Sequence, residues 1–470
     1  MKPWRVLSLA LGTALVAVAL PTFAQTGLAA PAMVPALVAP LAVAGKPKAP
    51  KNVIVMIGDG MGFNQLDAAG LYRYGTSAAQ VTVDARSGTI SRAPRTDVPE
   101  LVAADVKLAM RTTQWGGSYD PVQAWSSFDY VLRNPTDSAA AATAMATGVK
   151  TDNGAIGVDP DGKAVQNLSE LAIATGRSAG VVSSVPFSHA TPAGFSAHES
   201  SRSSYKSIAR DQLRSKLSVV MGAGHPWYND NHGKRGKAKY TYLYKSDYKK
   251  LKGGKSGFAF LTSKGAFDKL TTGPSPRRVF GLARVASTLQ QRRSGTTSKP
   301  GAKRNEVPTL ATMAKGALNV LDADRDGFFV MIEGGAIDWA NHANQSGRLV
   351  EESSDFLRAI AAVNSWVEAK SSWDETLVIV TADHESGYLS GAGAGAGAGA
   401  DPNWTMLTGR AGSVPAMSWH SVGHTSQLVP FYARGSAAGS FSEAVAGQDP
   451  VRGAFVDNTS VQKVVAGLWR

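Results

Sequence analysis

The chain has 470 residues, of which 43% are hydrophobic and 18% are charged. This composition excludes a disordered chain, and the length suits either one large α/β domain or two domains of ordinary size. The formal net charge is +13, and the chain contains no cysteine. Disulfides and a cysteine-linked lipid anchor are therefore excluded, and stability must come from core packing and bound ions.

The first 24 residues have the order of a secretory signal peptide. Lys2 and Arg5 precede an apolar run over residues 7–20, and cleavage is expected after Ala24. Residues 25–51 are rich in Ala, Pro and Val and predict a linker. No other stretch is long and apolar enough to span a membrane. We therefore expect a secreted protein, extracellular or periplasmic.

Short apolar runs recur along the chain, and helical patterns lie between several of them. The runs cover residues 52–57, 179–185, 217–221, 328–332, 376–381 and 428–433. From Leu349 to Ala369 the apolar residues recur at helical spacing. Strands that alternate with helices predict an α/β fold, a three-layer α/β/α sandwich around a large, mostly parallel sheet, as one catalytic domain over residues 52–470. Ligands of such sheets gather beyond the carboxyl ends of the strands.

Residues 231–304 interrupt this alternation. They contain 19 Lys and Arg residues but only two acidic residues, Asp247 and Asp268, together with many Gly, Tyr and Phe. The net positive charge of this segment therefore exceeds the net charge of the whole chain. We interpret them as an inserted basic segment, attached to a catalytic body that is close to neutral. A loosely structured, solvated excursion is favoured over a dedicated surface for anionic polymers.

Ser138 stands where an alanine-rich helix begins, directly after Thr136 and Asp137. A hydroxyl at this place lies beside free backbone N–H groups and the positive end of the helix dipole, which suits a nucleophile that attacks an anion. The alternative is a helix N-cap, for which Ser, Thr and Asp are the favoured residues. Asp137 is expected either to cap the helix or to form a hydrogen bond with Arg202.

Acidic and imidazole side chains follow or precede several predicted strands. They are Asp59, Glu333, Asp338, His342, Asp383, His384 and His424. Asp338 and His342 are four residues apart, so on a helix they share one face, as metal-ligand pairs commonly do. Mixed sets of His and carboxylate suit Zn²⁺, whereas sets of oxygen ligands suit Mg²⁺.

From about residue 52 to its end the chain resembles the secreted alkaline phosphatases. The strings that carry the resemblance are Gly58-Asp59-Gly60-Met61-Gly62, Thr136-Asp137-Ser138-Ala139-Ala140, Thr147-Gly148-Val149-Lys150-Thr151, Ala190-Thr191-Pro192-Ala193 with Arg202, Glu333-Gly334-Gly335-Ala336-Ile337-Asp338 with His342, Thr381-Ala382-Asp383-His384, and His424-Thr425. Each string alone is weak evidence. All of them in the order and spacing of the family are strong evidence.

The resemblance implies a role for each matching residue. Ser138 is the nucleophile, and Arg202 clamps the phosphoryl group. One Zn²⁺ is bound by Asp338, His342 and His424, a second by Asp383 and His384, and a Mg²⁺-type third site by Asp59, Thr191 and Glu333, with Asp59 between the second and third ions. The resemblance also favours a homodimer. The implied reaction is hydrolysis of phosphate monoesters through a phosphoserine intermediate.

Three further residues are expected beside this site. His189, two residues before Thr191, stands where some members have Asp, so it could hold a Mg²⁺-bound water or recruit Zn²⁺ or another divalent ion to the third site. Trp339 stands where some members have Lys, which removes a cation beside the phosphate. His420 could assist His424. His198 is interpreted as packing or support, and His225 and His232 as surface residues.

Two other functions remain open at this point. The nearest alternative is a phosphodiesterase or nuclease with the same metal core, in which the basic, Tyr-rich segment holds a nucleic-acid strand. The other is a non-catalytic protein whose basic segment contacts anionic polymers. Retention of Ser138 and of all the expected ligands argues against the second alternative.

Overall fold

A computed structural model describes residues 48–301, 304–395 and 402–470. These residues belong to one compact unit, Lys46–Arg470. The expected signal peptide, 1–24, and nearly all of the expected linker, 25–51, lie outside the described residues. Within the described part of the chain, no helix combines the length and the apolar character that a membrane span requires.

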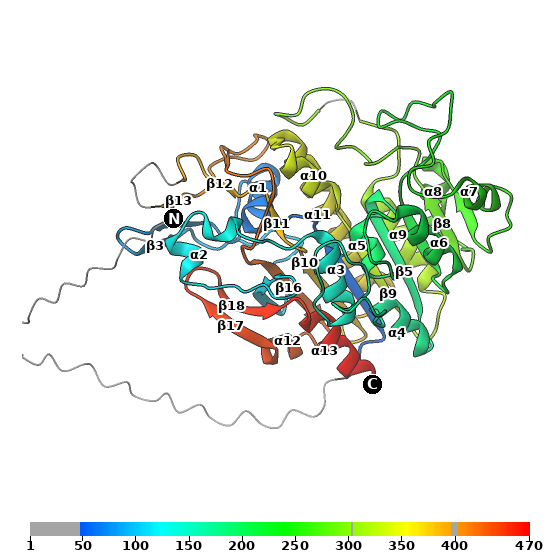
Figure 1. Ribbon diagram of the computed structural model, residues 1–470, viewed down its shortest axis with the longest axis horizontal. Helices are drawn as coiled ribbons and strands as arrows, with labels where there is room; N and C mark the ends of the chain where they lie inside the picture. The colour runs from blue at the N-terminus through cyan, green and yellow to red at the C-terminus, as the bar shows by residue number, and fades with distance from the viewer. Residues whose placement is uncertain (1–47, 302–303, 396–401) are drawn as a thin grey trace, which may run out of the picture. The chain divides into compact units, whose positions relative to one another are not determined.

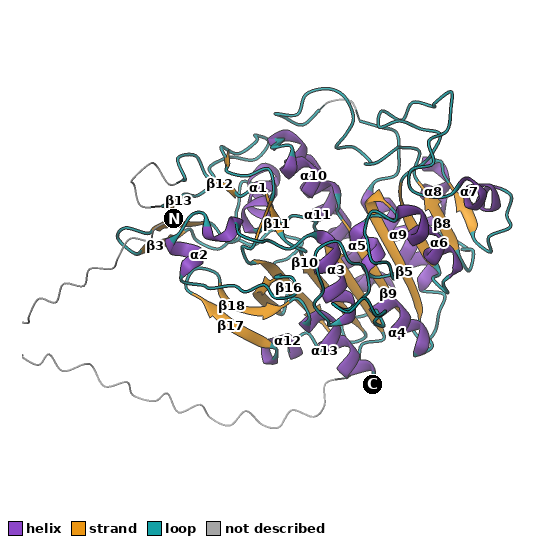
Figure 2. Ribbon diagram, viewed as in Figure 1, coloured by secondary structure: helices purple, strands orange, loops and turns teal. Residues whose placement is uncertain are grey.

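The unit is built on an eleven-stranded sheet (Figures 1 and 2). In spatial order its strands are β17 (Val445–Asp449), β18 (Gly453–Asp457), β4 (Val106–Arg111), β16 (Val429–Gly435), β10 (Thr376–Thr381), β1 (Asn52–Ile57), β9 (Phe328–Glu333), β5 (Ser178–Pro186), β6 (Val219–Ala223), β8 (Val279–Leu282) and β7 (Ala259–Leu261). From β10 to β7 all neighbours are parallel, whereas β16 and β17 run against their neighbours. The predicted mostly parallel sheet is confirmed.

The central strands are buried on both faces. Every residue of β1, β9 and β10 is buried, and most are Val, Ile, Met or Phe. Strands of this kind read as continuous apolar runs, which is why the sequence located them well. Their burial supplies a large share of the hydrophobic stabilisation of the unit.

Two sets of helices cover the sheet, one on each face (Figure 1). The first set, in which neighbouring helices contact one another, comprises α1 (Phe63–Tyr74), α8 (Lys264–Leu270), α9 (Leu310–Leu321), α10 (Ala336–His342) and α11 (Ser346–Lys370). The second comprises α3 (Ser138–Thr147), α4 (Leu168–Ala174), α5 (Ala190–Gly194), α12 (Ser440–Glu443) and α13 (Ser460–Trp469). The remaining helices are α2 (Gln123–Ser126), α6 (Tyr205–Arg214) and α7 (Lys245–Lys252), with one 3-10 turn at Tyr130–Leu132. The predicted three-layer arrangement is confirmed.

Short strands form three smaller sheets beside the main one. One contains β2 (Val81–Asp84), β3 (Thr89–Arg92) and β13 (Asn403–Trp404), and another pairs β12 (Leu389–Ser390) with β14 (Ser418–Trp419). The third pairs β11 (Glu385–Ser386) with β15 (His424–Thr425). This last pair brings His424 beside the residues that follow β10, about 40 positions earlier in the chain.

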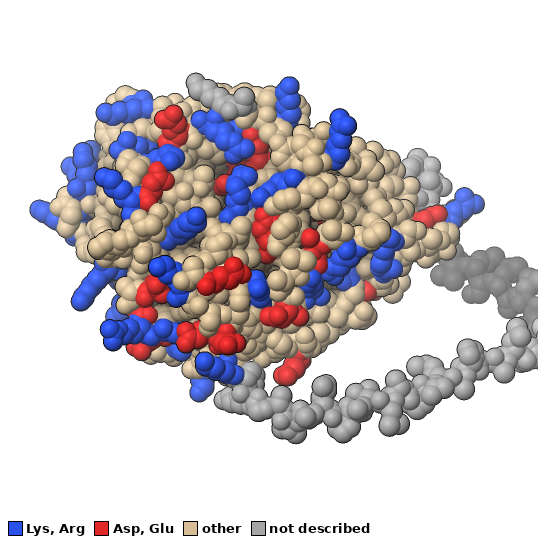
Figure 3. All heavy atoms as spheres, turned by 180° about the vertical axis from the view of Figure 1, so that it is seen from behind, with Lys and Arg blue, Asp and Glu red and all other residues tan. Residues whose placement is uncertain are grey.

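The prediction of a loosely structured excursion at residues 231–304 is wrong. This segment contributes α7, β7, α8 and β8, and its two strands extend the central sheet. Tyr248, Phe258 and Phe267 are buried and join the main hydrophobic core of the unit, so the segment folds despite its charge. Figure 3 shows Lys and Arg crowded on the surface toward this edge of the sheet, with few acidic residues among them.

A buried ion-pair network joins this segment to α11. The carboxylate of Glu351 forms ion pairs with Arg293 at 2.7 Å and with Arg348 at 2.9 Å, and the side chains of all three are at most 4% exposed. The backbone N–H of Gly301 donates to the same carboxylate at 2.6 Å. The network fixes the end of the basic segment against the helix that follows α10.

We expect Glu351→Ala to lower the free energy of unfolding by about 3–5 kcal/mol, because it leaves two buried guanidinium groups without their carboxylate. Glu368→Ala is the control: it lies on the same helix, but its side chain is 59% exposed and its pair with Arg434 is 3.8 Å long. A loss below about 1 kcal/mol is expected there. Urea unfolding measures both, and equal losses would contradict the assignment.

Candidate active site

Strand register brings the first acidic residues together. Ile57 of β1 pairs with Thr381 of β10, and Asp59 and Asp383 each lie two residues beyond. The backbone N–H of Gly60 donates to Asp383 Oδ1 at 3.0 Å. Gly60 has a φ of 68°, and an added Cβ would lie 2.8 Å from Ser386 Oγ, so the turn requires glycine.

Ser138 is the first residue of α3, and the helix cap is its neighbour. Asp137 accepts from the backbone N–H of Ala140 at 2.9 Å, which makes Asp137 the N-cap. Ser138 is 1% exposed, and its Oγ lies 3.1 Å from His384 Nε2. The N-cap explanation of Ser138 is therefore wrong. Its hydroxyl is left at the positive end of the helix, beside the acidic cluster.

The residues expected at the first zinc site lie together. Asp338 Oδ1 is 3.3 Å from His342 Nε2 and 3.5 Å from His424 Nε2. The Nδ1 atom of each imidazole forms a hydrogen bond with a backbone carbonyl. His342 bonds to Val422 O, and His424 bonds to Thr136 O. Nδ1–H donation of this kind leaves Nε2 free to bind a metal, an arrangement that metal-binding histidines usually show.

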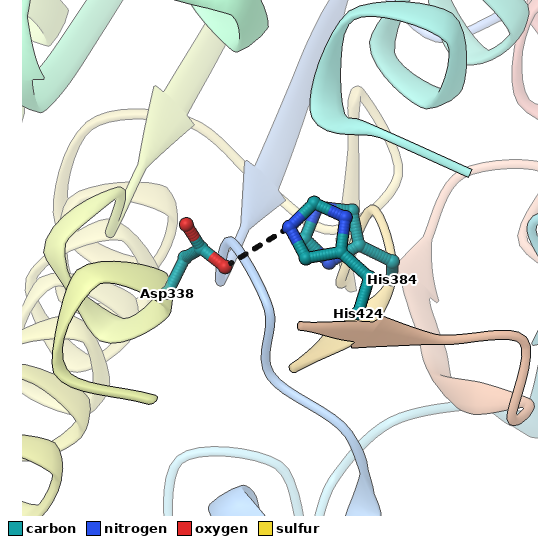
Figure 4. A group of neighbouring side chains, drawn as sticks. All are labelled: Asp338, His384 and His424. Atoms are coloured by element: carbon teal, nitrogen blue, oxygen red, sulfur yellow. Dashed lines mark ion pairs between the residues drawn. The ribbon is translucent and has the colours of Figure 1, made fainter. Parts of the chain in front are cut away.

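A second donor set adjoins the first through His384. Its Nε2 lies 3.3 Å from Asp383 Oδ2 and 3.5 Å from Asp59 Oδ1. Its ring stacks on that of His424 at 3.6 Å, and both rings approach Asp338, which projects from α10 (Figure 4). The ligand atoms of Asp338, His384 and His424, and those of Asp59, Asp383 and His384, are close enough for each set to hold one metal ion.

The expected third site has buried oxygen atoms that lack a partner. Thr191 Oγ1, Glu333 Oε1 and both carboxylate oxygens of Asp59 have no hydrogen-bond partner among the described residues. The other oxygen of Glu333 accepts from Ser183, a residue that the sequence did not single out. Buried oxygens without partners are costly, and a bound cation of the Mg²⁺ type would satisfy them.

The electrostatics of the cluster also fit bound cations. Burial and the neighbouring carboxylates raise the pKa of three acidic residues. The pKa of Asp59 is raised well above its ordinary value, the pKa of Glu333 is raised to about 7, and the pKa of Asp383 is raised to about 6. For Asp338 burial acts in the same direction, but hydrogen bonds from His342 and His424 outweigh it and lower the pKa. So many carboxylates can be ionised together at neutral pH only when positive charge is bound among them.

Arg202 lines the same pocket as Ser138. Its Nη1 donates to Asp137 Oδ2 at 2.8 Å, so Asp137 both caps α3 and orients this guanidinium. Both roles expected for Asp137 are thus present. The pocket has a volume of about 680 Å³ and is lined by Ser138, Arg202, Asp338, His342 and His424.

The pocket also contains residues that the sequence did not single out. Gln291, Arg292, Arg293 and Thr297 line it, and all belong to the basic segment. Assigning that segment to an attachment separate from the catalytic body was therefore wrong. Nothing in its local sequence indicated the contact, because the contact arises from how the chain returns across the sheet edge.

The three residues expected to support the site occupy different places. His189 is the N-cap residue of α5 and lines the pocket, its ring 5.6 Å from that of Trp339. Burial lowers the pKa of His189 to about 3, so the imidazole is neutral and able to accept or bind. The His420 ring instead packs on Phe128 and Tyr388.

The other histidines have structural roles. His198 bonds Gly157 O through Nδ1 and Glu170 through Nε2. His225 is only 5% exposed and packs on Tyr228 and Tyr248, so its assignment to the surface was wrong. It lies two residues after β6, and one of its aromatic neighbours, Tyr248, belongs to the basic segment.

The fold and the cluster define an α/β protein with a candidate metal centre around a serine at the carboxyl edge of its sheet. A profile of the alkaline phosphatase family matches residues 121–406. The chain belongs to the alkaline phosphatase family. It is 33% identical to alkaline phosphatase 3 of Bacillus subtilis over 359 residues, which are 75% of this chain and 65% of the relative. It is 30% identical to alkaline phosphatase H of Pseudomonas aeruginosa over 366 residues, 72% of this chain and 70% of that protein. The chain thus spans about two thirds of the length of these relatives.

Solved structures agree with this assignment. The alkaline phosphatase of the Antarctic bacterium TAB5 is 26% identical, covers 90% of this chain and all of its own, and gives a TM-score of 0.58. A variant of the TAB5 enzyme with Mg bound in its M3 site is 25% identical, covers 90% of this chain and 99% of its own, and gives a TM-score of 0.60. The family fold, with candidate metal sites, is therefore present here.

Proposed function

We propose that this protein is an alkaline phosphatase, a hydrolase that splits phosphate monoesters into an alcohol and inorganic phosphate. The observation that carries the proposal is the position of Ser138 Oγ. It lies in one pocket with Arg202, at the N-terminus of α3, and 3.1 Å from Nε2 of His384, which belongs to both groups of side chains close enough to hold a metal ion. Family membership supports the same reaction.

The donor sets fit two Zn²⁺ ions and one Mg²⁺ ion. Asp338, His342 and His424 would hold one Zn²⁺, Asp383 and His384 the second, and Asp59, Thr191 and Glu333 the Mg²⁺, although His189 could let the third site take Zn²⁺. When bound, such ions supply positive charge that stabilises the attacking and leaving oxygens of an in-line displacement.

The side chains of this protein supply the rest of the reaction. Ser138 Oγ attacks phosphorus, the bond from phosphorus to the alcohol oxygen breaks, and the alcohol leaves with a proton while a phosphoserine remains. Water then attacks the same phosphorus, and the bond to Oγ breaks to release phosphate. Arg202 suits a bidentate grip on two phosphoryl oxygens, since Asp137 already fixes its orientation.

Comparison of two substrates tests this proposal against its nearest alternative. The metal-loaded protein is expected to hydrolyse 4-nitrophenyl phosphate faster than the methyl diester of the same phosphate. A faster diester would instead favour a phosphodiesterase or nuclease. The monoesterase is preferred because the Tyr and Phe residues of the basic segment mostly pack inward, as Tyr248 and Phe258 do, and offer a nucleic-acid strand few rings for stacking.

We expect Arg202→Ala to lower kcat/KM for 4-nitrophenyl phosphate about 10²-fold, because one charged donor to the transferring phosphoryl group is lost. Arg202→Lys is expected to recover only part of the loss, since an ammonium lacks the bidentate fork. Arg214→Ala, at an exposed position of α6, is the control and should stay within about twofold of the wild type. Steady-state kinetics decide, and an equal effect of both alanine variants would contradict the clamp.

We further propose that the protein is exported and that residues 1–24 are removed, because their pattern is that of a signal peptide. N-terminal sequencing of the mature protein tests this directly. We propose a homodimer on the family resemblance, and sedimentation tests it. We also propose that the basic segment contacts anionic polymers, because of its local charge, and retention on a polyphosphate matrix tests this.

A further inference from the structure

The pocket continues beyond Ser138 to a wall made by residues 291–297. Arg292 lies in this wall, with its guanidinium 4.6 Å from the centre of the Trp339 indole. Trp339 follows the expected zinc ligand Asp338 directly in α10. The expected loss of a cation at position 339 is therefore met by an arginine from another part of the chain, stacked on the face of the tryptophan.

Neighbouring contacts hold this wall in place. Gln291 Nε2 donates to Trp339 O at 3.3 Å and to Gln345 Oε1 at 3.0 Å. The backbone N–H of Arg292 donates to Thr288 Oγ1 at 2.8 Å. The residues that follow Arg292 are tied to α11, through the buried Arg293–Glu351 pair and through the N–H of Gly347, which donates to Thr297 O at 2.8 Å. Arg292 is thus presented from a fixed backbone.

The charge of Arg292 is available to a ligand. The two other arginines of the pocket are already paired, Arg202 with Asp137 and Arg293 with Glu351. Arg292 forms no ion pair with an Asp or Glu of the described residues, and its side chain is exposed to the pocket and solvent. An exposed cation with one face on an indole keeps its N–H groups for an incoming anion.

We propose that Arg292, supported by Trp339, binds a second anionic group on the alcohol part of the substrate. The phosphoryl group is held at Ser138 and Arg202, so the alcohol part extends through the remaining pocket toward the 291–297 wall. The favoured substrates are then phosphate monoesters whose alcohol carries a carboxylate or another phosphate. This inference rests on the proposed phosphomonoesterase function and names its substrate class.

Binding of a matched ligand pair tests the inference without turnover. The ligands are 4-carboxybenzylphosphonate and 4-carbamoylbenzylphosphonate, which differ in one negative charge, titrated calorimetrically into the metal-loaded protein. The wild type is expected to bind the carboxylate about five- to tenfold more tightly, and Arg292→Gln is expected to bring the ratio close to one. Arg292→Lys should give an intermediate ratio.

The control removes the same charge outside the pocket. Arg277→Gln, at an exposed position of the basic segment, is expected to keep the wild-type ratio. If Arg292→Gln fails to fold, the wild type alone decides, because its ratio must then fall severalfold between 50 mM and 500 mM salt. A wild-type ratio of one, a ratio that Arg292→Gln leaves unchanged, or binding of neither phosphonate would overturn the inference.

The two proposals fail in different ways. A wild-type preference for the carboxylate that Arg292→Gln removes, in a protein that hydrolyses no phosphate monoester, would support Arg292 and refute the proposed function. Normal turnover of 4-nitrophenyl phosphate with a ratio of one would refute the role of Arg292 alone.

Discussion

Ser138→Ala is expected to lower kcat for 4-nitrophenyl phosphate by at least about 10³-fold, since no other hydroxyl takes the place of Oγ at the start of α3. The loss should appear in kcat, because the pocket, Arg202 and the donor sets remain to bind the substrate. Steady-state kinetics with protein of verified metal content provide the measurement.

Ser263→Ala separates nucleophilic chemistry from helix capping. Ser263 caps α8 and accepts from the backbone N–H of Ala266 at 3.3 Å, far along the chain from the pocket residues of α3. Its loss is expected to cost about 1 kcal/mol of stability and to leave kcat within about twofold. Full activity of Ser138→Ala would show that the phosphoserine mechanism is wrong.

Removal of divalent ions by a chelator is expected to abolish hydrolysis and to lower the unfolding temperature by at least about 5 °C. Asp59, Glu333 and Asp383 are fully buried close to one another, and without bound cations their negative charges repel one another. Re-addition of Zn²⁺ with Mg²⁺ should restore both properties. A chelated protein that keeps its unfolding temperature would contradict the metal centre.

The difference in stability between the metal-loaded protein and the ion-free protein should depend on pH. Burial raises the pKa of Asp383 from 3.8 to about 6 and of Glu333 from 4.5 to about 7, so between these values the folded ion-free protein holds more protons than the unfolded chain. Its stability therefore falls as pH rises from about 4 to 7, by at most about 3 kcal/mol for either group. Bound cations remove this dependence, so the two unfolding temperatures should differ more at pH 8 than at pH 5. A difference that shrinks toward pH 8 would contradict the sign.

The central strands and the strand-end residues could be predicted because each depends on a local signal. β1 and β10 have the predicted bounds, since strands buried on both faces read as continuous apolar runs. In a parallel sheet all carboxyl ends meet at one edge, so Asp59 and Asp383, which follow two of the predicted strands, are expected at the same edge. The register then aligned them two residues beyond a paired Ile and Thr.

The remaining features depend on contacts between distant parts of the chain. Charge in residues 231–304 suggested solvation, but Tyr248, Phe258 and Phe267 are buried in the main hydrophobic core and hold the segment against the sheet. Arg292 reaches the pocket only because Glu351 and Gly347 of α11 hold the neighbouring residues. No periodicity or short string indicates such a return, because the partners lie at least 50 positions away.

Trapping of the covalent intermediate tests the central claim most directly. Metal-loaded protein is mixed with a ³²P-labelled phosphate monoester, quenched with acid during turnover and digested, and the labelled peptide is sequenced. The proposed mechanism predicts one labelled peptide, with the phosphate on Ser138 and no label in Ser138→Ala. Label on another residue, or rapid hydrolysis with no covalent label under any quench condition, would contradict it.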